Sequence, residues 1–343
     1  MFTSILFAFL TSLIITYVVI PKVIFFADKF RLTDVPGERS SHKRSVPIFG
    51  GIAIFSGIIF SLLFWGKLDS IQFILVSLVI VFFVGVIDDL LGLSPYKKII
   101  GQLIAILIAI YLGKIQINSM HGVLGVYELP DIIATLFTVF VVIVITNGFN
   151  LIDGVDGLAS GIGVIASLGF GVMAYLMNQT DMAIIAFSLL GALLAFLKYN
   201  FHPARLFMGD TGSLLVGMTL SVLAINLIHS GVVTETIHFP NKGPLIAVVF
   251  LAIPLFDSLR VFVVRIIDGK NPLYAGREHI HHALLDLGLG HKRTAFALYL
   301  MSLLLIAVAY FLLELNINSS IAILALVSFI ILMIPYYILR KRK

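Results

Sequence analysis

Long apolar segments recur along the chain and are separated by short polar ones. A helix that crosses a membrane needs about 20 mostly apolar residues. The segments that reach or approach that length are residues 2–24, 48–66, 71–87, 97–112, 130–147, 157–177, 182–198, 212–229, 243–264, 294–314 and 319–338. Their apolar runs are continuous rather than alternating, which is not typical of a transmembrane barrel. The pattern predicts an all-α, polytopic integral membrane protein with about 11 transmembrane helices.

These helices leave no room for a separate soluble domain, so we expect one transmembrane domain over residues 1–343. The first segment begins with Met1-Phe2-Thr3-Ser4, which contains no basic residue, and no small-residue cleavage site follows it. A secretory signal peptide has both features. We therefore expect the first segment to be retained as a helix.

Composition excludes several classes of protein. Hydrophobic residues make up 60% of the chain and charged residues 12%, against about 45–50% and about 25% in soluble domains. So few charges could not cover the surface of a soluble fold, which excludes an ordinary cytosolic enzyme, a disordered protein and a nucleic-acid-binding module. The chain has no cysteine, which excludes disulfides, thiolate metal sites and a cysteine nucleophile.

Basic residues are distributed unequally between alternate loops. One set of loops comprises residues 25–47, 88–98, 148–156, 199–211, 265–293 and the tail after 338. Of the 23 Lys and Arg, only Lys67, Lys114, Lys242 and Arg260 lie outside these loops and the helix ends that adjoin them. The positive-inside rule makes this face cytoplasmic, with the N-terminus outside and the C-terminus in the cytoplasm. Arg260 lies three residues after Asp257, and the two charges could neutralise each other.

Five polar clusters lie on the predicted cytoplasmic face, and the first is Asp88-Asp89, followed by Lys97 and Lys98. Adjacent carboxylates at a membrane boundary are costly unless solvent or a cation offsets their charge. They could form a solvated helix end, or they could bind Mg²⁺ or a substrate phosphate, with one acting as a base. The two lysines could counter phosphate charge or anchor the helix among anionic headgroups.

The second cluster contains Asn150, Asp153 and Asp156 and is rich in glycine. Glycine lets the backbone approach a ligand closely, and a following helix N-terminus favours anions. A tight loop with Asx turns is the structural alternative. The third cluster begins at Asn200 and includes Asp210, which could be a plain N-cap or a Mg²⁺ ligand that acts with a substrate phosphate. Its Phe207 could stack on a base or serve packing.

The fourth cluster is Arg277-Glu278-His279-Ile280-His281-His282. Because the HExxH spacing and cysteine are both absent, zinc is disfavoured. The imidazoles beside Arg277 could bind pyrophosphate or a sugar, or the segment could be a solvated loop. The fifth cluster, residues 39–51, holds Lys43 among other bases and ends in Gly50-Gly51. Its bases could be topological signals only, whereas its glycines suit close approach by a phosphate.

Together the clusters supply carboxylates for a divalent cation, bases for phosphates and glycines for close approach, all on one face of the membrane. This chemistry indicates phosphoryl transfer from a soluble phosphorylated donor to a lipid acceptor at the cytoplasmic membrane surface.

The order of the clusters resembles the polyprenyl-phosphate N-acetylhexosamine-1-phosphate transferase family over nearly the whole chain. Its most specific parts are Asn150-x-x-Asp153-Gly-x-Asp156-Gly-Leu158, Phe207-Met-Gly-Asp210-x-Gly212 and Asp88-Asp89. The resemblance implies an integral membrane enzyme that uses Mg²⁺, with Mn²⁺ as an alternative, a UDP-sugar donor and a polyprenyl phosphate acceptor, and that releases UMP. A DDxxD prenyl-diphosphate motif is not present, because Asp88-Asp89 continues as Leu-Leu-Gly.

Within that family, the loop around His279, His281 and His282 resembles the GlcNAc-1-phosphate branch, which serves teichoic acid, the O-antigen of lipopolysaccharide and similar polymers. The resemblance thus implies transfer of GlcNAc-1-phosphate from UDP-GlcNAc to undecaprenyl phosphate in the cytoplasmic membrane, by an enzyme that can form a homodimer. The alternatives are the branch that transfers phospho-MurNAc-pentapeptide for the peptidoglycan precursor, and a transporter of an anionic or lipid-linked solute. A CDP-alcohol phosphotransferase is a further rival, although its DGxxAR pattern is absent.

The resemblance also implies roles for individual residues. Asp210 and Asp89 are the expected Mg²⁺ ligands, and Asp88 is the candidate base or the group that positions the acceptor phosphate. The expected substrate-binding residues are Lys43, Lys97, Lys98, Asn150, Asp153, Asp156, Asn200, Phe207, Arg277, His279, His281 and His282. We expect direct attack of the acceptor phosphate on the β-phosphorus of the donor, with an aspartyl-phosphate route as the alternative.

Overall fold

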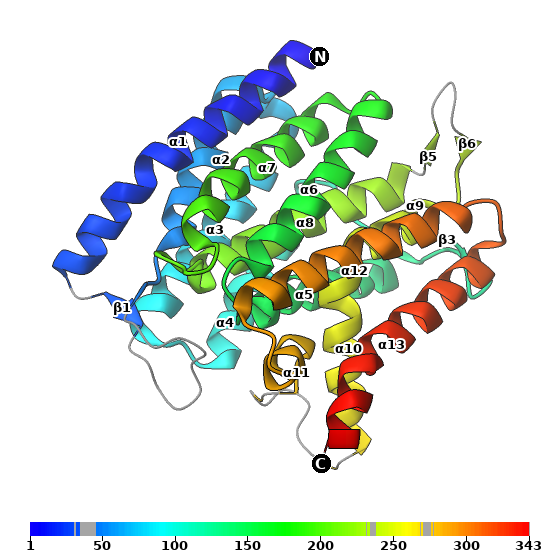
Figure 1. The fold of residues 1–343 in the computed structure, drawn as a ribbon. Coiled ribbons are helices and arrows are strands. Elements are labelled where there is room, and N and C mark those ends of the chain that lie inside the picture. The colour runs from blue at the N-terminus through cyan, green and yellow to red at the C-terminus, as the bar shows by residue number, and fades with distance from the viewer. Residues whose placement is uncertain are drawn as a thin grey trace.

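The computed structural model describes residues 1–30, 32–34, 46–230, 232–233, 238–267, 269, 276 and 278–342. Over these residues the fold is a bundle of helices with three small hairpins (Figure 1). The helices are α1 Phe2–Lys29, α2 Gly50–Trp65, α3 Leu68–Leu91, α4 Pro95–Tyr111, α5 Asp131–Ile152, α6 Leu158–Leu176, α7 Thr180–Asn200, α8 Gly209–Ser230, α9 Gly243–Phe250, α10 Ala252–Ile267, α11 Ile280–Asp286, α12 His291–Phe311 and α13 Ile317–Arg342.

The strands form three antiparallel pairs within loops. β1 Thr33–Asp34 pairs with β2 Val46–Pro47, β3 Ser119–Val123 with β4 Val126–Glu128, and β5 Val232–Val233 with β6 His238–Phe239. Each pair is too short to form a layer of its own. The fold is therefore all-α, as the sequence predicted.

Each of the predicted spans contains a helix. In the described part of the chain, 8 helices are long and apolar enough to cross a membrane, and the bent pair α9–α10 raises the number to 9. The predicted second and fourth spans correspond to α2 and α4, which have only 16 and 17 residues. A polytopic membrane protein is thus confirmed, while the count of 11 spans stays a prediction.

The ninth predicted span is broken. We expected one continuous helix over 243–264, but α9 ends at Phe250 and the axis turns by 81° into α10. Pro254 explains the break, because it has no N–H to donate to the carbonyl four residues earlier, and its ring crowds that carbonyl. After the bend, α10 packs against α5, α12 and α13 of the bundle.

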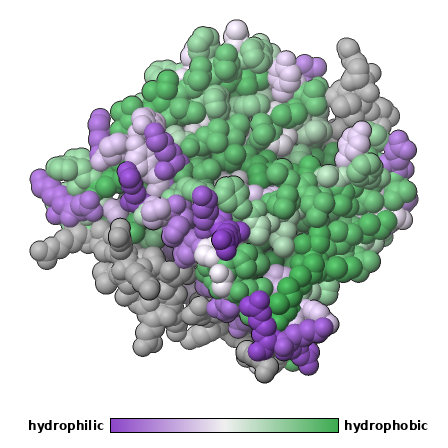
Figure 2. All heavy atoms as spheres, in the orientation of Figure 1, coloured by the Kyte–Doolittle hydropathy of each residue, from purple (hydrophilic) through white to green (hydrophobic). Residues whose placement is uncertain are grey.

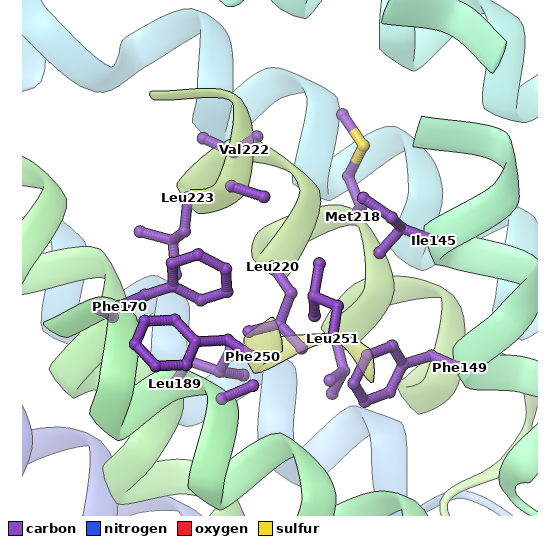
Figure 3. Close-up of a cluster of buried hydrophobic side chains, with 14 of the residues drawn as sticks. Ile145, Phe149, Phe170, Leu189, Met218, Leu220, Val222, Leu223, Phe250 and Leu251 are labelled. Atoms are coloured by element: carbon purple, nitrogen blue, oxygen red, sulfur yellow. The ribbon is translucent and has the colours of Figure 1, made fainter. Parts of the chain in front are cut away.

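α8 lies at the centre of the bundle. In its most apolar window 89% of the residues are buried, against 22% for α13 at the periphery. Figure 3 shows the core on one side of α8, where Leu220 and Leu223 lie near Phe170 of α6 and Phe250 of α9. The two phenylalanine rings meet edge to face at 5.1 Å between centroids. This packing fixes the helix whose first turn carries Asp210.

The described parts of the loops that the sequence assigned to opposite faces lie at opposite ends of the bundle. At one end, Lys67 N–H donates to Asp181 Oδ1 at 3.4 Å, and Leu124 N–H donates to Asn318 Oδ1 at 2.6 Å. The polar clusters lie at the other end. Figure 2 shows apolar surface across the helices, with the larger groups of polar residues on the left, in the centre and at the lower right of the view.

Candidate active site

Asp89 ties the end of α3 to the beginning of α8. Its carboxylate accepts hydrogen bonds from the backbone N–H groups of Asp210 and Thr211, at 2.8 and 3.0 Å, and from the Thr211 hydroxyl at 2.5 Å. The first amides of a helix have no partner within it and carry its positive dipole end, so a carboxylate is a favourable cap. The structure thus gives Asp89 a clear positioning role, and its predicted metal ligation stays a prediction.

Two glycines allow this junction to form. A Cβ on Gly85 of α3 would lie 2.4 Å from Thr211 Cα, and a Cβ on Gly51 of α2 would lie 2.3 Å from Gly212 N. Both distances are far below a van der Waals contact, so only glycine fits. We expected Gly50-Gly51 to admit a phosphate, but the backbone of α8 approaches Gly51, and the Phe196 ring and the Phe207 carbonyl approach Gly50.

Lys98 lies between two of the predicted catalytic carboxylates. Its Nζ is 2.7 Å from Asp88 Oδ2 and 3.0 Å from Asp210 Oδ1. Asn150 of α5 donates from Nδ2 to Asp210 Oδ1 and to Ser213 Oγ, the latter at 2.9 Å. Residues from α3, α4, α5 and α8 therefore meet at one point. Lys97 was predicted to bind substrate together with Lys98. In the structure its side chain is exposed on the surface of α4.

Asp153 follows the last residue of α5 and faces the same group. Burial raises the pKa of its carboxyl well above the usual range, and the nearby carboxylates of Asp210, Asp89 and Asp156 raise it further. So many carboxylates close together favour either a proton or a cation. Carboxylate oxygens are the ligands that Mg²⁺ and Mn²⁺ prefer, so the donor set fits the predicted cofactor.

Asp156 forms a separate cluster with two histidines that the sequence reading did not single out. Its Oδ2 lies 2.6 Å from His202 Nδ1 and accepts from Ala204 N–H at 3.2 Å, while Oδ1 lies 3.3 Å from His291 Nδ1. Burial alone would raise the pKa of Asp156, but hydrogen bonds from His291, His202 and Ala204 lower it to about 2. Asp156 is therefore an anion held between two imidazoles.

The ligand atoms of these three side chains lie within 4.8 Å of one another, a spacing that a metal ion could use. However, His291 Nδ1 also lies 3.3 Å from the backbone nitrogen of Asp156, so the ring packs against the backbone as well as the carboxylate. Hydrogen bonds and ion pairing thus account for the geometry without a metal. The sequence could have indicated His202 as a site residue, because it lies two residues after Asn200 in the third polar cluster.

Asn200 and Phe207 shape the loops around this cluster. Asn200 Oδ1 accepts from Gly157 N–H at 3.1 Å and from the Ser160 hydroxyl at 2.8 Å, and its Nδ2 donates to Leu206 O at 3.0 Å. Phe207 N–H donates to Pro47 O at 2.8 Å. Asn200, predicted to bind the nucleotide, is buried and holds two loops together in the structure.

The histidine segment, residues 279–282, is anchored on α10. His279 Nδ1 lies 2.7 Å from Asp257 Oδ2, and Ile280 N–H donates to Asp257 Oδ1 at 2.9 Å. Arg260 lies 3.4 Å from the same carboxylate. The Asp257–Arg260 pair that the sequence suggested therefore exists, and it supports the histidine segment.

His281 links this segment to the carboxylate group. Its Nε2 would lie 2.6 Å from a Cβ on Gly154, the residue after Asp153. Burial lowers the pKa of His281 to about 3, helped by the neighbouring His282, so this imidazole is neutral near pH 7. Arg277 and Lys43 lie outside the described residues.

Known proteins match the chain over most of its length. The model of glycosyl transferase family 4 matches residues 71–228, a range that contains Asp88, Asp153 and Asp210 but not the histidine segment. The probable undecaprenyl-phosphate N-acetylglucosaminyl 1-phosphate transferase of Bacillus subtilis is 34% identical over 298 residues, which are 86% of this chain and 81% of the relative.

Two further relatives come from other bacteria. The decaprenyl-phosphate N-acetylglucosaminephosphotransferase of Mycolicibacterium smegmatis is 31% identical over 318 residues, covering 85% of this chain and 78% of the relative. The undecaprenyl-phosphate alpha-N-acetylglucosaminyl 1-phosphate transferase of Escherichia coli is 29% identical over 313 residues, covering 87% and 82%.

Proposed function

The chain belongs to glycosyl transferase family 4, and on that premise we propose that it transfers GlcNAc-1-phosphate from UDP-GlcNAc to undecaprenyl phosphate, giving undecaprenyl-diphosphate-GlcNAc and UMP. The observation that carries this proposal is the group of Asp88, Lys98, Asn150 and Asp210, brought together from four helices at the polar end of the bundle. The names of the relatives support the same donor sugar and a polyprenyl phosphate acceptor.

The acceptor phosphate needs a cation and a fixed position rather than a strong base. A phosphate monoester has a second pKa near 6, so it is mostly dianionic near pH 7. Lys98 carries the positive charge beside Asp88, and it could pair with the acceptor phosphate when substrate enters. Asp88 then orients Lys98 and keeps the acceptor deprotonated. One oxygen of the phosphate attacks the β-phosphorus of the donor in line, and UMP departs.

Asp210 and Asp153 are the residues that we assign to Mg²⁺, with Asp89 holding Asp210 in place. When bound, the ion would neutralise charge on the donor diphosphate. Asn150 fixes the Asp210 side chain by donating to its carboxylate. The carboxylate of Asp210 thus has a defined direction before any substrate arrives.

We expect the donor to bind between Asp156 and the histidine segment. Asp156 and Phe207 lie in loops that could receive the uridine, while His281 and His282 lie next to Gly154 and could contact the diphosphate and the sugar. A neutral His281 can donate or accept a hydrogen bond without adding charge. Because the bases concentrate at this end, we propose that the site faces the cytoplasm from a multi-pass position in the cell membrane.

The test is a direct assay of UMP release. The purified protein, in lipid nanodiscs with undecaprenyl phosphate and Mg²⁺, is incubated separately with UDP-GlcNAc and with UDP-MurNAc-pentapeptide. We expect UMP with UDP-GlcNAc and its loss on chelation with EDTA, restored by Mg²⁺ or Mn²⁺. Release only with UDP-MurNAc-pentapeptide would assign the other branch. Solute flux without UMP from either donor would make the protein a transporter.

A further inference from the structure

The cytoplasmic end of α13 contacts the segment that carries the histidines. The Tyr336 hydroxyl donates to Glu278 O at 2.7 Å and accepts from Arg260 Nη2 at 2.6 Å. The Arg260 guanidinium also lies over the Tyr336 ring, 4.1 Å from its centroid. Tyr336 is thus bonded to the residue that directly precedes His279.

A second contact lies at the other end of α11. Arg342 Nη1 donates to Leu287 O at 3.2 Å, just past the last residue of α11. Tyr336 and Arg342 are six residues apart, which is about 9 Å along a helix, and α11 has 7 residues. The last turns of α13 therefore hold α11 at both ends, and Figure 1 shows the two helices side by side at the bottom of the bundle.

Buried side chains connect Tyr336 to the loop that carries Asp153. Arg260 joins Tyr336 to Asp257, which is fully buried and holds both His279 and the backbone of Ile280. His279 and His281 have nearly parallel rings, 5.8 Å apart, and His281 then touches the loop of Asp153 through Gly154. A continuous series of contacts runs from α13 to the proposed site.

We propose that Tyr336 is a positioning residue for the nucleotide-sugar donor: its hydroxyl holds the start of the histidine segment so that the imidazoles face the donor diphosphate. This rests on the proposed function, since the segment contacts a donor only if the protein is a transferase. Partly buried hydrogen bonds such as those of the Tyr336 hydroxyl restrict a segment to one position, which reduces the entropy lost when a ligand binds.

The variant Tyr336→Phe removes the hydroxyl and keeps the ring under Arg260. The matched control is Tyr337→Phe on the same turn, because the Tyr337 ring is 60% exposed and lies 4.7 Å from Lys341 Nζ, away from α11. Both full-length variants are studied in nanodiscs by hydrogen exchange of peptides spanning 278–287, and by steady-state UMP release at varied UDP-GlcNAc and undecaprenyl phosphate.

In Tyr336→Phe we expect faster exchange over 278–287 and a rise of about three- to tenfold in KM for UDP-GlcNAc, the usual effect of one lost hydrogen bond. The KM for undecaprenyl phosphate and kcat should stay within about twofold, and Tyr337→Phe should match the parent in both measurements. A general loss of folding would instead lower the active fraction and hence kcat.

Two results would overturn the proposal. Unchanged exchange over 278–287 would show that Tyr336 does not hold the segment, and faster exchange with an unchanged donor KM would show that the segment does not position the donor. If the parent protein releases no UMP from any donor, the proposed function fails, and the positioning of a donor by Tyr336 fails with it. In that case faster exchange would still establish the contact between α13 and α11 as a structural one.

Discussion

Lys98 illustrates how one side chain decides the charge of the proposed site. Its ammonium group lies between the carboxylates of Asp88 and Asp210. Both N–O distances are those of direct ion pairs. Removing one partner from a partly buried ion pair leaves the other charges uncompensated, at a cost of about 3–5 kcal/mol. A phosphate that entered the site would also lose its counter-charge.

We therefore predict that Lys98→Gln lowers kcat/KM for UMP release by at least about 100-fold, a factor that about 3 kcal/mol would produce. The neighbouring Lys97→Gln is the matched control, because Lys97 is exposed one position away on the same helix. Its activity should stay within about twofold of the parent. Equal losses in the two variants would contradict the assignment of Lys98 to the site.

Asp210 provides the sharpest test of the metal assignment. We predict that Asp210→Asn abolishes UMP release even at saturating Mg²⁺, because an amide oxygen carries no charge to hold the ion. The hydrogen bonds from the α8 amides to Asp89 use the Asp210 backbone, so the junction should persist. The unfolding temperature of the variant in detergent tests whether the junction persists. The control is Asp69→Asn, at the opposite end of α3. Near-normal activity of Asp210→Asn would exclude it as a required ligand.

Asp156 predicts a defined dependence of stability on pH. Its pKa is about 2 in the folded protein, below an unfolded value of about 3.9. A depressed pKa stabilises the fold fully above the unfolded value, and that contribution is lost as the pH falls from about 4 toward 2. The unfolding temperature of the parent should thus exceed that of Asp156→Asn near pH 6, and the difference should shrink below pH 4.

The exposed variant Asp131→Asn serves as the control for this measurement. It should follow the parent protein at each pH. A constant difference between the parent and Asp156→Asn from pH 6 to pH 3 would show that the carboxylate is not held by His202 and His291 as an anion.

At the scale of elements, the contact between α3 and α8 controls the geometry of the site. Gly85 lets the two backbones meet where Asp89 caps α8. We predict that Gly85→Ala destabilises the protein by about 1–3 kcal/mol, because the added methyl group overpacks a backbone contact. It should also lower UMP release, since Asp89 and Asp210 would separate.

Gly290→Ala is the control for that substitution. No atom lies within 4 Å of a Cβ at Gly290, and its φ of −68° suits any residue. Its unfolding temperature and activity should match those of the parent. A Gly85→Ala protein with parental stability would mean that the helices separate more easily than the structure suggests.

The helices themselves could be predicted because a membrane span requires a long apolar run, and that requirement is visible in the sequence. The break before Ala252 was less accessible, since Pro254 can lie within a span when neighbouring helices satisfy the backbone. α11 was not predicted because its 7 residues are too few for periodicity, and its place depends on Asp257 and Tyr336, which are far away in the sequence.

The same limit applies to the site. The sequence singled out Asp88-Asp89 because adjacent carboxylates at a membrane boundary are costly and therefore informative. Asp153 was expected to bind the donor, and its position beside Asp89 and Asp210 became visible only in the structure. The sequence did not distinguish Lys98 from Lys97, because helix rotation decides which one faces inward. His202 and His291 escaped notice because their partner, Asp156, lies on another loop.

At the scale of the whole molecule, the described parts of the predicted cytoplasmic loops lie at one end of the bundle, and the candidate site lies there. The opposite end is built from short loops and the β3–β4 hairpin, which is tied to the first turn of α13 through Leu124 and Asn318. A water-soluble donor and a lipid acceptor can meet only at the membrane surface. The orientation of the bundle therefore decides which compartment supplies the nucleotide sugar.

That orientation can be tested with single cysteines, because the chain has none of its own. Leu124 is 85% exposed in the β3–β4 turn, and Lys341 is exposed near the end of α13. In sealed right-side-out vesicles, a membrane-impermeant maleimide should label Leu124→Cys and should label Lys341→Cys only after permeabilisation. The cysteine-free parent gives the background. The reversed pattern would place the site outside the cell. If both positions were labelled from the same side, the number of spans between them would be even, which would contradict the predicted topology.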